Sequence, residues 1–216
     1  MASNLATPGV YIEEKSSFGT SVVPVATAIP AFVGYTEKAL RGTKSLTNVP
    51  TKISNFGEFV ELFGDAPNTL FSISQPNKSK PKPAAKEGDS PAAKADDAKT
   101  GSSEYSLEID MDTRYLMYDA IRLYYVNGGS DCYIVSVGSY TDKISAKALN
   151  DVAVGGGLAA LEKFTEPTIL VIPEAVLLTE ADCYSVQAAM LQHCGFKMKN
   201  RFAVLDVYNG NSERTF

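Results

Sequence analysis

Three short apolar runs in the second half of the chain predict the strands of a parallel sheet. They cover 132–138, 168–173 and 201–208. A weaker helical pattern over 158–164 separates the first two runs, and a longer helix is predicted from Thr179 through about Cys194, where Gly195 ends it. Strands that are continuously apolar and alternate with helices are typical of a parallel sheet covered on both faces. The pattern therefore predicts an α/β fold with right-handed crossovers.

The region before these runs predicts one more strand and two more helices. The strand lies near 29–35. The first helix follows Ser54, a good N-cap, and Gly64 closes it. Its apolar positions recur at helical spacing: Phe56, Phe59, Val60 and Phe63. The second helix has a longer apolar stripe: Leu116, Met117, Ala120, Ile121, Tyr124 and Tyr125. Asp110 or Asp112 can cap its start, and Asn127-Gly128-Gly129 can end it.

The segment 76–104 has a different composition from the rest of the chain. It contains six Lys, five acidic residues and four Pro, and no apolar residue larger than Ala. Such a segment cannot bury enough surface to offset its ordering entropy, so we expect a flexible surface insertion. A solvated spacer fits this balanced charge better than a nucleic-acid-binding arm does. The predicted parts are an extended arm at 1–20, an N-terminal region at 21–75, the insertion, and an α/β domain at 105–216.

Composition and charge narrow the classes of function. The 216 residues are 44% hydrophobic and carry a net charge of −5, which argues against a nucleic-acid or anionic-membrane partner. The sequence contains no apolar run long enough to cross a bilayer and no visible secretory signal, so folding in the cytoplasm is expected. Cys132, Cys183 and Cys194 lack metal-ligand spacing and are expected to be free buried thiols.

Few residues in the sequence are candidates for a catalytic or ligand-binding role. His193 is the only histidine; we expect it to be a structural cation at a helix C-terminus, and not half of a dyad with Cys194. Gly155–Gly157 could present N–H groups to a phosphate, but the spacing matches no phosphate-binding motif, so a tight connection is favoured. Glu174 and Asp206 fall at the carboxyl ends of predicted strands, where α/β sites lie. A structural role is favoured for Asp206, and no catalytic residue, cofactor or metal is expected.

The N-terminal sequence "TPGVYIEEKSSF" predicts a short strand without a nearby hairpin partner. The candidate strand comprises Pro8, Gly9, Val10, Tyr11, Ile12, Glu13 and Glu14. A small, polar candidate hinge follows it: Lys15, Ser16, Ser17, Phe18 and Gly19. An unpaired strand leaves backbone groups available for pairing with another chain, although a partner in the same chain stays open at this point.

Six segments, in order, resemble contractile tail sheath proteins. They are "TPGVYIEE", "VATAIPAFVGYTEKA", "ISNFGEFVELFG", "AIRLYYVNGGSDCYIVSVG", "PTILVIPEAVLL" and "RFAVLDVY". These segments are most similar to the sheaths of phage-tail-like contractile injection systems, which are extracellular toxin-delivery particles. The resemblance covers nearly the whole chain except 76–104.

This resemblance implies a structural protein and not an enzyme. Sheath subunits stack into a helical sleeve around an inner tube, between a baseplate and a cap, and contract to drive the tube through a target membrane. Terminal arms add strands to the sheets of neighbouring copies. The α/β region of the family is called subtilisin-like for its fold, without protease activity. Residues 8–14 would be the inter-subunit arm and residues 15–19 its hinge, without nucleic-acid partners or direct membrane insertion.

The chain also departs from the family. The family's C-terminal domain is missing after Phe216, so we expect this chain to be the N-terminal part of a longer protein. The insertion at 76–104 is expected on the outer surface of the sleeve. Two other functions stay open: a cap or tube adaptor of the same particle, and a doubly wound nucleotide-binding or hydrolase domain.

Overall fold

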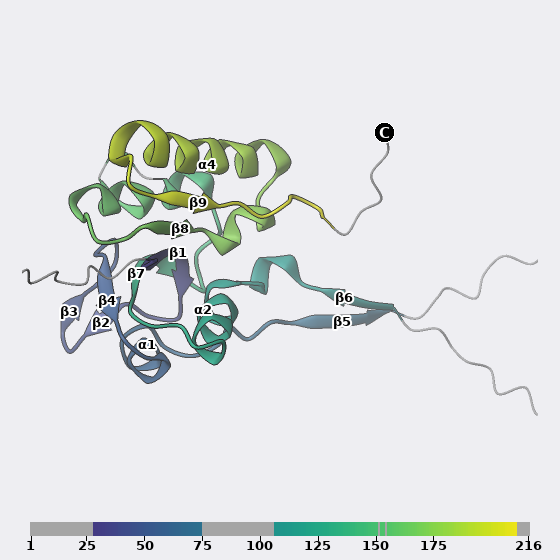
Figure 1. The fold of residues 1–216 in the computed structure, drawn as a ribbon. Coiled ribbons are helices and arrows are strands. Elements are labelled where there is room, and N and C mark those ends of the chain that lie inside the picture. Colours follow the sequence, from purple (N-terminus) through teal and green to yellow (C-terminus); the bar gives the residue numbers. More distant parts are fainter. Residues whose placement is uncertain (1–27, 75–105, 151, 154, 211–216) are drawn as a thin grey trace, which may run out of the picture.

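A five-stranded sheet forms the middle layer of the computed structural model, which describes residues 28–74, 106–150, 152–153 and 155–210 (Figure 1). The strands, in their order across the sheet, are β4 (Thr51–Ile53), β7 (Cys132–Ser139), β1 (Pro30–Thr36), β8 (Ile169–Val171) and β9 (Phe202–Val204). β7, β1, β8 and β9 run parallel, which confirms the predicted α/β fold with a parallel sheet. The antiparallel edge strand β4 was not predicted.

Helices cover the two faces of the sheet and enclose two separate cores. Helices α1 (Phe56–Phe63) and α2 (Met117–Val126) cover one face, here called the α2 face. Helix α4 (Glu180–Gln192), the short α3 (Ala146–Leu149) and the 3-10 helix η2 (Gly157–Lys163) cover the other, the α4 face. Strand β1 contributes side chains to both cores, because its residues alternate between the two faces of the sheet. Ala31 and Val33 lie in the α4-face core, whereas Phe32 lies in the α2-face core.

The observed helices differ from the predicted ones in their ends or in their type. Asn55 caps α1 in place of Ser54, and its Oδ1 accepts a hydrogen bond from the Glu58 N–H at 2.8 Å. The predicted helix over 158–164 is a 3-10 helix. Gly195 does not end the last helix: α4 continues into the π-helix η4 (His193–Met198), which closes at Lys199 in a left-handed conformation. The Thr179 cap of α4 and the Gly64 end of α1 are confirmed.

Two small hairpins and two further 3-10 helices complete the fold. β2 (Leu40–Arg41) pairs with β3 (Lys44–Ser45), and β5 (Phe71–Ser74) pairs with β6 (Ser106–Ile109). The 3-10 helix η1 (Met111–Thr113) precedes α2, and η3 (Pro173–Leu177) follows β8. The β5–β6 hairpin projects away from the body of the molecule (Figure 1). No helix in the described ranges is both long enough and apolar enough to span a bilayer.

Candidate assembly surface and strand-end crevice

Glu174 fills the crevice at the carboxyl ends of β1 and β8. Across the sheet the parallel strands lie in the order β7, β1, β8, β9, whereas the chain forms β1 first and β7 second. The connection from β1 therefore leads to one side and the later strands lie on the other, so the strand order reverses at the gap between β1 and β8. In open α/β sheets of this kind, ligands bind outside that gap. Glu174 follows β8 and is 0% exposed, and its Oε1 accepts a hydrogen bond from the Met117 N–H at 2.9 Å. The position that usually takes a ligand is therefore occupied by a side chain of the protein itself.

This carboxyl also caps helix α2. The N-cap residue Leu116 offers no side-chain acceptor, and Asp110, a predicted cap, instead caps η1 through the Asp112 N–H. Glu174 supplies the missing acceptor from a distant part of the chain, so the prediction that Asp110 or Asp112 caps this helix is wrong. Sequence patterns find caps only among neighbouring residues, which explains why this one was missed.

Burial controls the ionisation of Glu174. Desolvation raises its pKa to about 7, although nearby backbone N–H groups, including those of Met117 and Tyr35, act in the opposite direction. Only Oε1 has a well-aligned partner; the buried Oε2 accepts no hydrogen bond from the described residues. Gly34 makes room for this oxygen, since a Cβ there would lie 2.3 Å from Oε2. The expectation that Glu174 lies at the carboxyl end of a strand is confirmed, and its contacts are those of a packing and capping residue.

Tyrosine side chains close the crevice further. The Tyr35 and Tyr115 rings lie 5.8 Å apart, and those of Tyr115 and Tyr140 lie 4.8 Å apart. The Tyr115 hydroxyl donates to the carbonyls of Tyr140 and Asp142, at 2.9 and 2.8 Å. Burial is the first cause that raises the pKa of each of the three phenols, so they stay protonated at neutral pH. Their hydroxyls are therefore neutral partners of backbone groups at this end of the sheet.

His193 is buried and neutral, which corrects the expected helix-end cation. It is 2% exposed, and its Nε2 lies 2.9 Å from Nη1 of Arg201. Because arginine can only donate, Nε2 is the acceptor and the ring proton is on Nδ1. Burial, followed by the charge of Arg201, lowers the pKa of His193 to about 4. Burial and the charge of Arg201 therefore keep this imidazole neutral, although a helix C-terminus favours a cation.

The remaining candidate residues are the three cysteines and Asp206. Cys132, Cys183 and Cys194 are free and buried as expected, and burial raises the pKa of the Cys132 thiol to about 11. The Asp206 carbonyl accepts a hydrogen bond from the Gln187 side chain at 2.7 Å, while the Asp206 residue itself is exposed. No three His, Cys, Asp or Glu side chains within the described part of the chain are grouped closely enough to hold a metal ion.

Two of the three glycines, Gly156 and Gly157, are closely packed against other parts of the chain. The Gly157 N–H donates to Oδ1 of Asn48 at 2.9 Å, and a Cβ at Gly156 would lie 2.8 Å from the same Asn48 side chain. This N–H group therefore binds a protein side chain. The favoured interpretation of Gly155–Gly157 as a tight connection agrees with these contacts.

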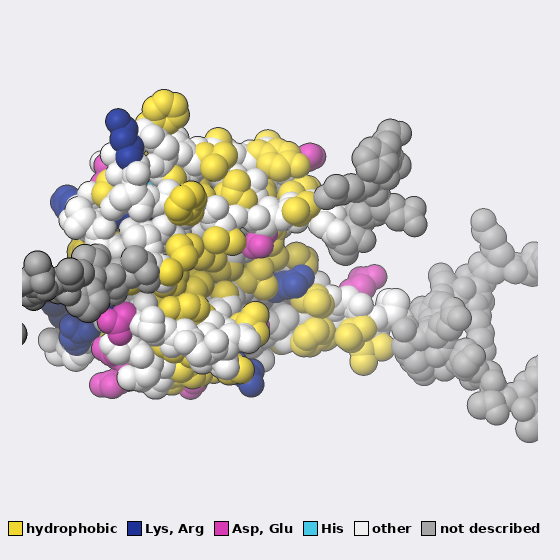
Figure 2. All heavy atoms as spheres, in the orientation of Figure 1, with side chains coloured by type: hydrophobic (Ala, Val, Ile, Leu, Met, Phe, Trp, Pro, Cys, Tyr) yellow, Lys and Arg dark blue, Asp and Glu magenta, His cyan; other side chains and the backbone are white. Residues whose placement is uncertain are grey.

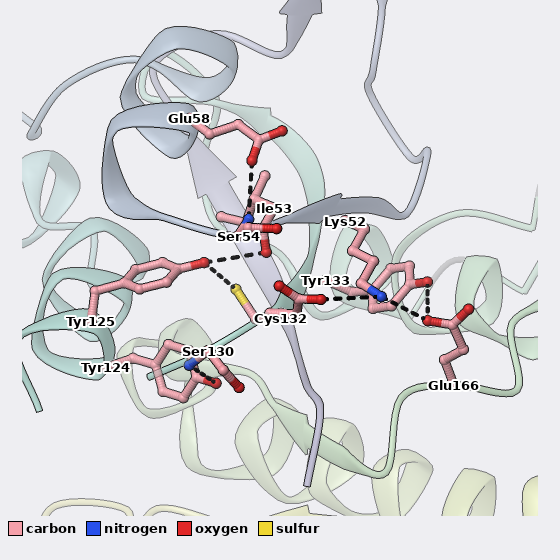
Figure 3. Close-up of polar contacts among 11 residues, drawn as sticks. Lys52, Ile53, Ser54, Glu58, Tyr124, Tyr125, Ser130, Cys132, Tyr133 and Glu166 are labelled. Carbon is pink, nitrogen blue, oxygen red and sulfur yellow. Dashed lines mark hydrogen bonds and ion pairs between the residues drawn. The ribbon is translucent and has the colours of Figure 1, made fainter. Parts of the chain in front are cut away.

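A polar network at the amino end of β7 was not predicted from the sequence (Figure 3). Lys52 on β4 pairs with Asp131 at 3.3 Å and with Glu166 at 3.2 Å, and the Tyr133 hydroxyl donates to the same Glu166 carboxylate at 2.9 Å. Tyr125 on α2 donates to the Ile53 carbonyl at 3.3 Å. The charged groups are largely exposed, so the ion pairs contribute little stability. The network aligns the edge strand β4 with β7.

No helix in the described part of the chain covers the α2 face of the sheet over β9, although the apolar strands are typical of a parallel sheet covered on both faces. Phe202 and Val204 pair in register with Ile169 and Val171 of β8, and Val171 packs against the α2-face core. The two β9 side chains therefore point to the same face, yet they are 79% and 51% exposed. Figure 2 shows hydrophobic side chains gathered over this part of the molecule. β9 is also an edge strand within the described sheet, with backbone groups along one side that no described strand pairs.

The β5–β6 hairpin carries a second exposed apolar surface. Its register places Phe71 opposite Ile109 and Ile73 opposite Leu107, so these four side chains share one face. All eight hairpin residues are exposed, including Ile73 at 70%. A two-stranded hairpin is marginally stable in water without packing against another surface. The apolar hairpin face and the open face at β9 (Phe202, Val204) are therefore the candidate assembly surfaces.

The predicted arm at 8–14, its hinge at 15–19 and the insertion at 76–104 fall outside the residues that the structure describes. The arm and the hinge thus stay predictions. The insertion connects β5 to β6 in the sequence.

Of the comparisons with known proteins, the one with solved structures gave matches. No known protein family matches the chain, and no curated protein does. Among solved structures, the chain is similar to a cryo-EM structure of the anti-feeding prophage (AFP) helical sheath in the contracted state. The identity is 23% and the TM-score is 0.46. The match covers 97% of this chain and 42% of that chain, so the present chain spans less than half the length of the sheath chain.

Proposed function

We propose that this chain is a structural subunit of the contractile sheath of a phage-tail-like injection system. The observation that carries the proposal is the pair of exposed apolar surfaces, on β9 and on the β5–β6 hairpin. Exposed apolar surfaces of this kind mark sites of protein–protein contact. The ordered sequence segments that resemble sheath proteins name the type of assembly.

Two different surfaces suit a subunit of a helical sleeve. A contact between unlike surfaces repeats from copy to copy, and it generates an open helical array when its rotation does not close into a ring. The β9 face and the hairpin belong to separate elements, so one copy can contact different neighbours through each. We propose other copies of this chain and related sheath subunits as the occupants of these surfaces. The inner tube, baseplate and cap are the further proposed partners.

The closed crevice favours an assembly role over an enzymatic one. Glu174 and the tyrosines fill the position where a doubly wound enzyme binds its ligand, and His193 is committed to Arg201. We therefore propose that the chain is not an enzyme. Energy for contraction would come from a metastable extended sleeve, in which subunits are trapped around the tube during assembly. We further propose that the chain folds in the cytoplasm and that the mature particle is extracellular.

Deletion of residues 1–14 tests the proposed inter-subunit arm. In the particle-producing system, we expect the deletion to abolish full-length sheaths, because neighbouring copies would lose the backbone hydrogen bonds of the added strand. Negative-stain images of purified particles measure sheath length, and a label on the chain separates a sheath position from a cap or baseplate position. Full-length sheaths formed by the deleted chain would contradict the arm, and a label confined to the particle end would contradict the sheath role.

Phe202→Lys tests the open face at β9. Phe202 is 79% exposed, so the substitution should leave the fold intact while placing a charge on the contact surface. We expect an at least tenfold loss of assembled sheath, measured by sedimentation. Leu191→Lys, at a 54% exposed position on α4, is the matched control and should assemble normally. An equal loss in both variants would argue against a specific role of β9.

A further inference from the structure

The dipeptide Asn-Gly occurs twice in the chain, at Asn127-Gly128 and at Asn209-Gly210. This dipeptide is prone to deamidation, because a glycine has no Cβ to keep its backbone nitrogen away from the asparagine side chain. The glycine nitrogen attacks the asparagine Cγ and forms a new C–N bond. The side-chain amide then leaves as ammonia, which takes up the proton lost by the attacking N–H. Water opens the resulting cyclic imide to aspartate or isoaspartate, so the reaction needs water as its only co-reactant.

Hydrogen bonds restrain the first of these dipeptides at the end of helix α2. The Asn127 side-chain amide donates to the Leu123 carbonyl at 2.7 Å, and the Gly128 N–H donates to the Tyr125 carbonyl at 3.1 Å. Both groups that would have to react are therefore bound to carbonyls of the same helix. The reaction at Asn127 requires the last turn of the helix to open first.

The second dipeptide lies in an exposed turn that follows β9. Tyr208 packs against the α4-face core, and beyond it Asn209 and Gly210 are both exposed. Neither of these two residues donates a backbone hydrogen bond to another described residue. Asn209 has φ = +49°, a left-handed conformation that a short polar side chain tolerates. Closure of the imide ring requires this backbone to rotate, and an exposed turn without such hydrogen bonds can rotate at little cost.

We propose that Asn209 is a site of spontaneous deamidation in the folded protein, whereas Asn127 is protected by its hydrogen bonds. Exposure does not separate the two positions, since both asparagines are exposed. The product adds one negative charge to the segment that leaves β9, and isoaspartate also lengthens the backbone there by one CH₂ group. The proposal concerns the isolated fold and does not depend on the sheath function.

Incubation of the purified chain at pH 8, followed by tryptic digestion and mass spectrometry, measures both reactions in one sample. Trypsin places the two dipeptides in different peptides, 123–143 and 202–214. Fragmentation of the second peptide separates Asn209 from Asn211, and a sample taken before incubation corrects for deamidation during digestion. We expect Asn209 to react about tenfold faster than Asn127 or more, because two hydrogen bonds must break before Asn127 can react.

The same incubation in urea is the control for the intrinsic reactivity of each dipeptide. Unfolding removes the hydrogen bonds at the end of α2, so Asn127 and Asn209 should then react at similar rates. A difference that disappears in urea therefore comes from the fold and not from the neighbouring sequence.

Gly210→Ala tests the attacking group directly. The added Cβ hinders ring closure, and it would lie 3.3 Å from the Val207 carbonyl oxygen, so the exposed turn accepts it with a small shift. We expect slower deamidation at Asn209 and an unchanged rate at Asn127. Equal rates at the two asparagines in the folded chain, a rate ratio that persists in urea, or an unchanged rate in Gly210→Ala would each overturn the proposal. Sheath assembly does not enter any of these readouts, so a failure here leaves the assembly proposal intact.

Discussion

Arg201→Leu is expected to lower the free energy of unfolding by about 3 kcal/mol, because it leaves the Phe164 carbonyl and Nε2 of His193 without the donor that Arg201 supplies. Arg201 is 5% exposed and donates to the Leu161 carbonyl at 3.1 Å, to the Phe164 carbonyl, and to Nε2 of His193 at 2.9 Å. The two carbonyls belong to the carboxyl end of η2, where a cation also stabilises the helix dipole. Burial of the charged guanidinium is itself unfavourable and lowers its pKa, so its removal offsets part of the lost stability.

Lys197→Leu is the matched control for this prediction. Lys197 lies on the neighbouring π-helix and pairs with Glu162, but both side chains of this pair are more than a third exposed. An exposed ion pair contributes about 0–1 kcal/mol, so the control should remain close to the wild type. Urea unfolding followed by circular dichroism compares the two variants. A loss in Arg201→Leu no larger than that in Lys197→Leu would show that the buried guanidinium is not a structural anchor.

The pH dependence of the same variant reports on His193. Its pKa is about 4 in the folded protein against 6.5 in a model peptide, so the folded state binds fewer protons between these values. The stability that depends on a neutral imidazole is present above pH 6.5 and is lost as the pH falls toward 4. Arg201→Leu removes the charge that contributes to this shift, so the stability gap between wild type and variant should narrow from pH 7.5 to pH 5. Glu174 has the opposite dependence, but it is present in both proteins and cancels from the comparison.

Local patterns predicted the elements well, and the errors concern contacts between distant residues. Helix α1 follows the spacing of its phenylalanines, and only its cap moved by one position, from Ser54 to Asn55. Helix α2 was predicted from its apolar stripe, but its cap is Glu174, which is far away in the sequence. The continuation of α4 through Gly195 into a π-helix was also missed, since the glycine was taken as the end of the helix.

The exposed surfaces illustrate a second limit of sequence reasoning. The run over 201–208 was predicted as a third apolar strand of a sheet of the type covered on both faces, and an apolar run does not identify what covers it. Phe202 and Val204 have the composition of a covered strand, yet no described helix lies over them. The hairpin strands β5 and β6 were missed because they are short and flank a long polar insertion. Both features became visible only when the register and the exposure of each side chain were known.

Gly157→Ala is expected to destabilise the fold by about 4 kcal/mol, through strain and collision together. The backbone of Gly157 has φ = +54°, a conformation that costs an L-residue about 1–2 kcal/mol. A Cβ at this position would also lie 2.4 Å from the Leu149 carbonyl oxygen and 2.5 Å from that of Ala148. These are backbone atoms at the end of α3, so they cannot move aside as a flexible side chain can. Relief requires a shift of α3 relative to η2, which adds about 1–3 kcal/mol of overpacking cost.

Gly155→Ala separates the two contributions to this loss. Gly155 has φ = +69°, but a Cβ there would meet no atom within 4 Å, so this variant pays only the strain. Urea unfolding should therefore place Gly155→Ala about 1–2 kcal/mol below the wild type and Gly157→Ala well below both. Equal losses in the two variants would mean that α3 and η2 can separate at little cost. The predicted difference measures how tightly the connection is packed, which a glycine-rich sequence cannot indicate, since the same residues would also suit an open phosphate loop.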